Sequence, residues 1–129
     1  MKIYSFEKLL VWQKAIKFNV IIYKTTSLFP KEEIFGLTAQ MRKCSVSISS
    51  NIAEGSGRHS AKDKARFTEI AFGSALELLN QTIISRDLGY LSNENYNAIR
   101  NDIEQITSML DGLYKSQLKN LESKNTTKP

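Results

Sequence analysis

Residues 45–58 read S-V-S-I-S-S-N-I-A-E-G-S-G-R, a helical pattern in which small and polar residues are unusually frequent. Four of them recur at helical spacing and therefore share one face: Ser47, Asn51, Glu54 and Arg58. An apolar stripe runs beside them: Leu37, Met41, Cys44, Ile48 and Ile52. We expect a helix that becomes regular between residues 32 and 37 and ends at Gly55 and Gly57. Its serines either let a neighbouring helix approach closely or merely occupy half-exposed positions.

Two further predicted helices carry apolar residues on two sides. The first spans residues 6–28 with Ser5 as its N-cap, and the other spans residues 61–88, between an N-cap at Ser60 and a terminating Gly89. The two stripes of residues 6–28 are Leu9, Trp12, Ile16, Val20 and Tyr23, and Val11, Ala15, Phe18 and Ile22. Those of residues 61–88 are Phe67, Ala71, Ser74 and Leu78, and Phe72, Leu76, Leu79 and Ile83. Because large exposed apolar patches are rare on monomers, we expect the second stripes to pack between subunits; a wide monomeric core is the alternative.

A last predicted helix begins after its N-cap Ser92, extends to about Leu121, and has apolar residues at alternating spacings of four and three. Short turns join the four helices, and no segment shows strand alternation. The sequence therefore predicts an all-α, up-down-up-down antiparallel four-helix bundle over residues 1–122 that assembles into a ring-like homo-oligomer. Residues 123–129 contain no apolar side chain, and we expect them to be a disordered basic and polar tail.

Composition limits the classes of function. The chain has 129 residues, which suits one domain, and its single cysteine excludes an intrachain disulfide. No stretch approaches the roughly 20 apolar residues of a membrane span, so we expect a cytoplasmic protein without membrane contact. The formal net charge of +5 permits an acidic partner without requiring one.

Catalytic and metal-binding signatures are weak. His59 is the only histidine and falls in a turn, while Cys44 falls on an apolar stripe, so we expect no catalytic residue, metal or cofactor. Glu54, Glu69 and Glu77 could form an acidic enzymatic site, but paired structural carboxylates are the favoured interpretation because no cofactor signature accompanies them. The candidates for structural polar contacts are Arg42, Asn51, Glu54 and Glu77, with Glu54 placed four residues before Arg58 for an ion pair.

Positive charge is concentrated at the turn after residues 45–58. The candidate nucleic-acid-binding residues there are Arg58, Lys62, Lys64 and Arg66, with Asp63 as the one opposing charge, and Lys14, Lys17 and Lys24 add a basic strip on residues 6–28. Without interleaved aromatic residues, binding to RNA or DNA would follow backbone charge rather than sequence. A solvated basic turn, or a protein-interaction scaffold that never contacts nucleic acid, are the alternatives.

Five segments carry a family resemblance. They are F-E-K-L-L-V-W-Q-K-A at 6–15, L-F-P-K-E-E-I-F-G-L-T-A-Q-M-R at 28–42, the opening stretch at 45–58, I-A-F-G-S-A-L-E-L-L at 70–79 and L-G-Y-L at 88–91. Together they resemble the four-helix-bundle family of proteins encoded in intervening sequences of bacterial 23S ribosomal RNA genes. Leu79 departs from the glutamate that the family often has, which puts a shared polar network near Glu77 in doubt.

The resemblance implies an up-down bundle that assembles as a ring-like pentamer. It extends to the accessory variability determinant protein of diversity-generating retroelements, a basic pentamer that partners a reverse transcriptase and binds nucleic acid. By resemblance, a pentamer would bury the second apolar stripes and repeat the basic turn five times around a ring. Several weak charge patches acting together would bind with avidity.

Overall fold

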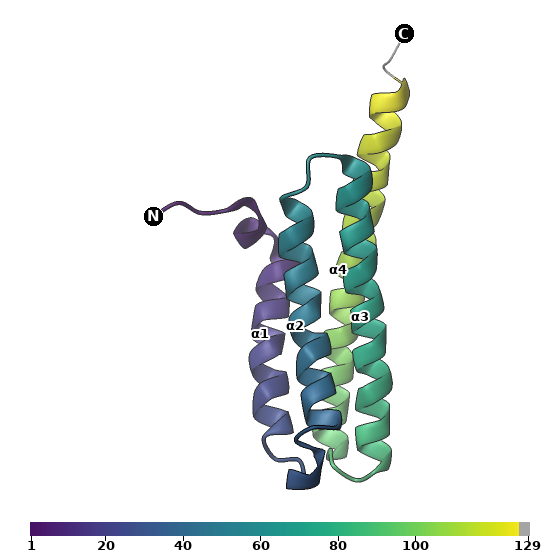
Figure 1. The fold of residues 1–129 in the computed structure, drawn as a ribbon. Helices are drawn as coiled ribbons and strands as arrows, with labels where there is room; N and C mark the ends of the chain where they lie inside the picture. Colours follow the sequence, from purple (N-terminus) through teal and green to yellow (C-terminus); the bar gives the residue numbers. More distant parts are fainter. Residues whose placement is uncertain (127–129) are drawn as a thin grey trace.

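A computed structural model describes residues 1–126 of the chain. Within this part there are four α-helices and two short 3-10 helices, and no strand. Successive long helices run in opposite directions, so the chain passes down α1 (Leu10–Thr26), up α2 (Leu37–Ser56), down α3 (Ala61–Asp87) and up α4 (Asn93–Thr126) in the view of Figure 1. The predicted all-α fold of four helices is confirmed. None of the helices in the described part combines the length and the apolar run that a bilayer crossing requires.

The first helix differs from its prediction at both ends. In place of one helix over residues 6–28 with a Ser5 cap, a 3-10 turn, η1 (Ser5–Lys8), precedes α1 and is separated from it by extended backbone at Leu9 (φ −75°, ψ 124°). Tyr4 caps the turn, and its backbone N–H donates to Glu7 Oε2 at 2.8 Å. The break lets the Phe6 ring fold back onto Trp12, with ring centroids 5.0 Å apart and an edge-on angle of 67°. The chain thus forms an aromatic contact between Phe6 and Trp12 where the sequence predicts that the helix continues.

α3 and α4 begin where their caps predict, and α2 begins at Leu37, within the predicted interval of residues 32–37. A second 3-10 turn, η2 (Lys31–Glu33), follows Pro30 and leads into α2. The side chain of Ser60 accepts the Asp63 N–H at 3.1 Å, and the side chain of Ser92 accepts the Asn95 N–H at 3.1 Å. These bonds satisfy backbone donors that a helix N-terminus leaves free.

The C-terminus of α3 is a Schellman turn. Gly89 has φ +80°, its N–H donates to Arg86 O at 2.9 Å, and the Tyr90 N–H donates to Ser85 O at 2.9 Å. The left-handed backbone explains the glycine at this position. At the other end of the chain α4 runs to Thr126, beyond the expected end at Leu121, so residues 123–126 are helical where we expected the tail to begin. Residues 127–129 of that predicted tail lie outside the described part.

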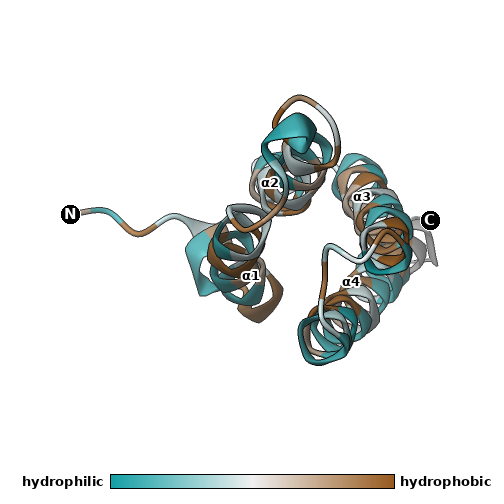
Figure 2. Cartoon of the chain, turned by 90° about the horizontal axis from the view of Figure 1, so that it is seen from below, coloured by the Kyte–Doolittle hydropathy of each residue, from teal (hydrophilic) through white to brown (hydrophobic). Residues whose placement is uncertain are grey.

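The core fills the interior that the four helices enclose (Figure 2). The predicted stripe of α2 is buried from Met41 to Ile52, and Leu37 packs against it. On α4 the core is formed by Ile99, Ile103, Ile106 and Leu110, at the predicted spacing. The helix pairs α1–α2, α2–α3 and α3–α4 pack along their lengths, whereas α1 and α4 meet least extensively.

The second apolar stripes of α1 and α3 lie in different surroundings. On α3 the second stripe is mostly half-buried against the core of the same chain, through Phe72, Leu79 and Ile83, so a wide monomeric core accounts for it. On α1 the stripe from Val11 to Ile22 is buried, and of the other stripe Leu9 and Trp12 pack against the core while the rest remains at the surface. Its exposed members are Ile16 at 37%, Val20 at 51% and Tyr23 at 44%, and Val46 on α2 is exposed at 39%.

Gly55→Ala is expected to lower the free energy of unfolding by about 1–3 kcal/mol. A Cβ at this position would lie 2.7 Å from the Phe67 Cβ, an atom fixed to the α3 backbone, so the two helices would have to move apart. Gly112→Ala in α4 is the matched control, because a Cβ there meets nothing within 4 Å. It should raise stability by about 0.5–1 kcal/mol through its higher helix propensity. Urea denaturation followed by circular dichroism checks both, and equal effects of the two changes would contradict the close α2–α3 contact.

Candidate nucleic-acid interface

The basic turn joins α2 to α3 at the end of the bundle that is uppermost in Figure 1. Arg58, just past α2, is held in place from two sides. Its Nη2 lies 3.0 Å from Glu54 Oε1, and its guanidinium carbon lies 4.5 Å from the centroid of the Phe67 ring. The predicted Glu54–Arg58 ion pair is therefore confirmed. Both groups are largely exposed, so the pair positions the arginine more than it stabilises the fold.

The other three cations of the turn lie on α3 and differ in their freedom. Lys64 Nζ donates to the carbonyl oxygen of Ser56 at 3.0 Å, so this ammonium satisfies a carbonyl at the negative end of α2. Lys62 and Arg66 are exposed, and no carboxylate of the described residues lies within ion-pair distance of either. The turn thus presents two free cations beside two that are fixed by the fold.

The basic strip on α1 is not continuous with this turn. Lys14 Nζ lies 3.2 Å from Asp102 Oδ1, with side-chain exposures of 27% and 21%, and so links α1 to α4. Lys17 and Lys24 are exposed and share the outer face of α1, seven residues apart. Because α1 runs away from the basic turn, Lys24 lies near the opposite end of the bundle (Figure 1).

Of the residues predicted to make structural polar contacts, Arg42 is the one that joins α2 to another helix. Arg42 donates from Nε to Thr26 Oγ1 at 2.9 Å and from Nη2 to the Tyr23 carbonyl at 3.2 Å, which ties α2 to the C-terminus of α1. Asn51 Nδ2 donates to the Ser47 carbonyl at 2.8 Å and to Ser47 Oγ at 3.0 Å. Glu77 pairs with neither Arg42 nor Arg58 within the chain and instead lines a pocket.

The serines of α2 are divided between two helix contacts. Ser47 Oγ lies 2.9 Å from Ser74 Oγ on α3, whereas Ser45 and Ser49 face α1 and bond to the two ends of the Asn19 amide. The expectation that short serines serve close helix contact is confirmed on both sides. Asn19 was missed in the sequence because a single asparagine between phenylalanine and valine has no distinguishing pattern.

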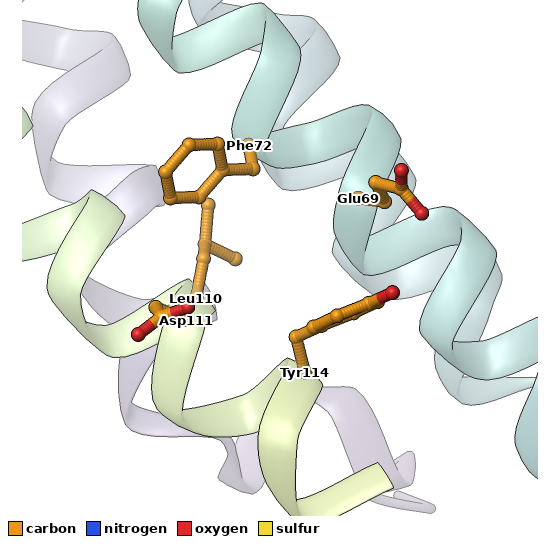
Figure 3. Close-up of a pocket in the computed structure, with 5 residues that line it drawn as sticks. All are labelled: Glu69, Phe72, Leu110, Asp111 and Tyr114. Carbon is orange, nitrogen blue, oxygen red and sulfur yellow. The ribbon is translucent and has the colours of Figure 1, made fainter. Parts of the chain in front are cut away.

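A pocket between α3 and α4 bears on the alternative that Glu69 belongs to an enzymatic site. Glu69 and Phe72 of α3, with Leu110, Asp111 and Tyr114 of α4, line a pocket of about 180 Å³ (Figure 3). The Asp111 carboxylate points away from Glu69 and bonds to Lys115 at 2.9 Å, so the two carboxylates do not converge on one point. His59 is exposed in the basic turn, away from this pocket. In the part of the chain that the structure describes, no group of three His, Cys, Asp or Glu side chains could hold a metal ion.

Comparison with known proteins places this geometry in a family. The family described as 23S rRNA-intervening sequence protein matches residues 7–112. The chain belongs to this family. The match to the 23S rRNA-intervening sequence family includes α1, α2, α3, the basic turn and the core residues of α4.

A solved structure with the same fold supports the assignment. It is the crystal structure of a protein of unknown function from the S23 ribosomal protein family of Bacteroides thetaiotaomicron VPI-5482. The similarity has a TM-score of 0.75 at 27% sequence identity and covers 82% of this chain and 99% of the other. A search of curated proteins found no match. Membership in the 23S rRNA-intervening sequence family therefore fixes the fold and leaves the activity to be argued from the surface.

Proposed function

We propose that this protein is a non-enzymatic, ring-like homo-oligomer, a pentamer, that binds nucleic acid or a ribonucleoprotein partner in the cytoplasm through its basic α2–α3 turn. The observation that carries the proposal is the pair of exposed cations, Lys62 and Arg66, which have no carboxylate partner among the described residues. Their neighbours Arg58 and Lys64 are already positioned by Glu54 and Ser56. Cations held at a surface can neutralise phosphates and release counterions.

The contacts favour recognition of the phosphate backbone rather than of bases. Phe67 is the aromatic residue nearest the cations in sequence, and the Arg58 guanidinium covers its ring at 4.5 Å. That ring is not free to stack on a nucleobase. Binding should therefore be tolerant of sequence and strongly dependent on salt.

The exposed apolar stripe of α1 supports the homo-oligomer. Ile16 and Val20 on this stripe are 37% and 51% exposed, and Tyr23 is 44% exposed although the Arg42 guanidinium lies 4.7 Å from the centroid of its ring. A second copy of the chain could remove this surface from water. The pentameric number comes from the family resemblance, which implies a ring-like pentamer. A ring would also repeat the basic turn, so that weak phosphate contacts act together.

The double substitution Lys62→Ala with Arg66→Ala is expected to weaken binding to duplex DNA or RNA and to flatten its salt dependence. Each lost phosphate contact should reduce the slope of log K against log salt by roughly 0.9, so the slope should fall by about 2 for each subunit in contact. Fluorescence anisotropy with labelled duplexes over a series of salt concentrations measures this slope.

Lys31→Ala is the control, because Lys31 lies at the opposite end of the bundle in η2. It should leave both affinity and slope within error. Undetectable binding of the unaltered protein at low salt would refute phosphate contact, as would an unchanged slope in the double variant.

A protein-interaction scaffold is the second candidate, and one observation favours it. The turn between α1 and α2 exposes three large apolar side chains: Leu28 at 78%, Ile34 at 56% and Phe35 at 92%. This turn lies at the opposite end of the bundle from the basic turn (Figure 1). Failure of the nucleic-acid experiment would leave this apolar turn as the better candidate for a partner site.

A further inference from the structure

The proposed ring needs two different surfaces on each subunit. A cyclic ring of more than two identical subunits is assembled head to tail, so one surface of each copy contacts another surface of the next. The exposed stripe of α1 is one such surface. Within the described part of the chain, α1 and α3 do not contact each other, and they lie at diagonal corners of the bundle (Figure 2). The outer side of α3 therefore faces away from the α1 stripe, as a head-to-tail contact requires.

The outer side of α3 has apolar residues that the core of the same chain does not cover. Ile70, Leu76 and Ile84 are all exposed. Gly73 lies between the first two and is exposed as well, and a Cβ added there would meet nothing within 4 Å. Glycine destabilises the interior of a helix relative to alanine, so the fold of the single chain gains nothing from it. Its position leaves a shallow notch in which a side chain of another subunit can lie.

The exposed side of α1 combines apolar residues with positive charge. The helix contains three lysines and no carboxylate. Lys14 is bound to Asp102, whereas no carboxylate of the described residues lies within ion-pair distance of Lys17 or Lys24. The α1 patch is defined here by four residues: Ile16, Val20, Lys17 and Lys24.

The exposed side of α3 has the opposite charge. From residue 67 to residue 85 this helix contains two glutamates and no cation. Both of them, Glu69 and Glu77, are exposed, and no cation of the described residues lies within ion-pair distance of either. That holds also for Lys43 of α2, which lines a polar pocket between α2 and α3 together with Glu77. The α3 patch, which complements the charge of the α1 patch, is defined by five residues: Glu69, Ile70, Gly73, Leu76 and Glu77.

Hydrogen bonds across the bundle show which parts of α1 and α3 lie at the same level. Asn19 of α1 bonds to Ser45 and Ser49 of α2. Ser47, which lies between those two serines in sequence, bonds to Ser74 of α3. Asn19 and Ser74 therefore lie at about the same level along the bundle. Since α1 and α3 run in the same direction (Figure 1), positions on both helices can be counted from this level.

The charged residues of the two patches match in level. Lys17 lies two residues before the shared level and Glu69 lies five before it. Lys24 lies five residues after that level and Glu77 lies three after it. The members of each lysine–glutamate pair thus differ by three residues and by two, or about 3–5 Å along the helix axis. The flexible four-carbon stem of a lysine can span this difference.

We propose that the α1 patch of one copy packs against the α3 patch of the next copy around the ring. This interface rests on the proposed homo-oligomer and names the surfaces that form it. In a ring whose axis runs along the bundle, residues at the same level meet, so Lys17 pairs with Glu69 and Val20 lies beside the notch at Gly73. Lys24 then pairs with Glu77. Two α1 patches facing each other would instead oppose lysine to lysine, which disfavours a self-paired contact.

Reversing the charges of each patch tests this pairing. The double substitution Lys17→Glu with Lys24→Glu should raise the protein concentration at which half the chains are assembled by about tenfold or more, because like charges would meet. Glu69→Lys with Glu77→Lys should do the same. All four substitutions in one chain restore opposite charges and should return this half-assembly concentration to that of the unaltered protein. Light scattering over a dilution series at low salt measures it.

Two results of the charge reversals would overturn the proposal. One is an assembly that either double variant leaves unweakened. The other is an assembly that the four substitutions together fail to restore, although the variant has the same net charge as the unaltered chain. Circular dichroism should give the same helix content for all of these proteins.

Glu32→Lys with Glu94→Lys is the matched control for net charge. It makes the same charge change at two exposed carboxylates outside both patches. The half-assembly concentration of this control should equal that of the unaltered protein. A loss of assembly as large as in Glu69→Lys with Glu77→Lys would show that net charge alone is responsible, against the proposal.

Gly73→Leu tests the apolar part of the contact. The leucine should leave the helix content unchanged, because a Cβ at this position meets nothing within 4 Å in the chain. It should fill the notch and raise the half-assembly concentration. Gly112→Leu on α4 is the control, since a Cβ there is equally free of contacts and lies outside both patches. Equal effects of the two substitutions on assembly would place Gly73 outside the contact and contradict the proposal.

The outcomes separate this interface from the proposed homo-oligomer. A mass of 14.6 kDa for the unaltered protein at every concentration would refute the homo-oligomer and this interface together. An assembled protein that is insensitive to charge reversal in both patches would refute the interface alone. The nucleic-acid experiment changes Lys62 and Arg66 and leaves both patches intact, so phosphate binding can fail separately.

Discussion

Phe18→Ala is expected to lower the free energy of unfolding by about 3–5 kcal/mol. Phe18 lies on the buried stripe of α1, is 2% exposed, and belongs to the core that all four helices share. Its truncation removes apolar contacts and leaves a cavity that the surrounding helices can only partly fill. Urea denaturation monitored by circular dichroism measures the effect.

Phe35→Ala makes the same chemical change at a residue that is 92% exposed. Its effect should stay within about 0.5 kcal/mol, as for other surface substitutions. Both variants should be compared at a protein concentration where their masses in solution are equal, so that assembly does not contribute. A loss below about 1 kcal/mol in Phe18→Ala would contradict the burial of this stripe.

Helix ends were predictable from the sequence where their signals are local. Ser60, Ser92 and Gly89 act on backbone groups within four residues, and each does what its position predicts. The break at Leu9 has no such signal, because leucine is a good helix former. It depends on Phe6 packing on Trp12, a contact between side chains that the pattern of apolar residues cannot specify.

The candidate site was predictable as a set of cations but not as an arrangement. Lys14 looked equivalent to Lys17, yet it bonds to Asp102, which is far away in sequence and close only once α4 has folded beside α1. Lys64 likewise looked equivalent to Lys62 until the α2 carbonyl of Ser56 came within reach. Charge patterning therefore identifies where cations gather, whereas tertiary contacts decide which of them remain available.

The apolar stripes show that the sequence pattern also cannot tell which apolar residues the folded chain covers. Periodicity marked α1 and α3 alike as two-sided, but only α3 has a neighbour of the same chain on its second side, so its residue Phe72 is half-buried while Val20 on α1 is exposed. The bundle thus separates three surfaces: the basic turn at one end, the apolar stripe along α1, and the polar pocket between α2 and α3. A homo-oligomer that packs through α1 would leave the basic turn free at the end of each subunit.

The double substitution Ile16→Glu with Val20→Glu is expected to convert the proposed homo-oligomer into monomers. Both side chains lie on the exposed stripe of α1, at 37% and 51% exposure, so the fold of a single chain should tolerate the change within about 0.5 kcal/mol per residue. In an interface, by contrast, each glutamate would bury a charge without a partner, which is strongly unfavourable. Light scattering should give five times 14.6 kDa for the unaltered pentamer and 14.6 kDa for the variant.

The matched control adds the same two charges elsewhere, through Asn97→Glu and Gln105→Glu on the exposed side of α4. Its mass should equal that of the unaltered protein, and circular dichroism should give the same helix content for all three proteins. An unaltered protein of 14.6 kDa would refute the assembly itself. A variant that keeps the full mass would instead place the interface on another surface, because two adjacent carboxylates on one helix face cannot be accommodated in an apolar contact without a measurable loss of affinity.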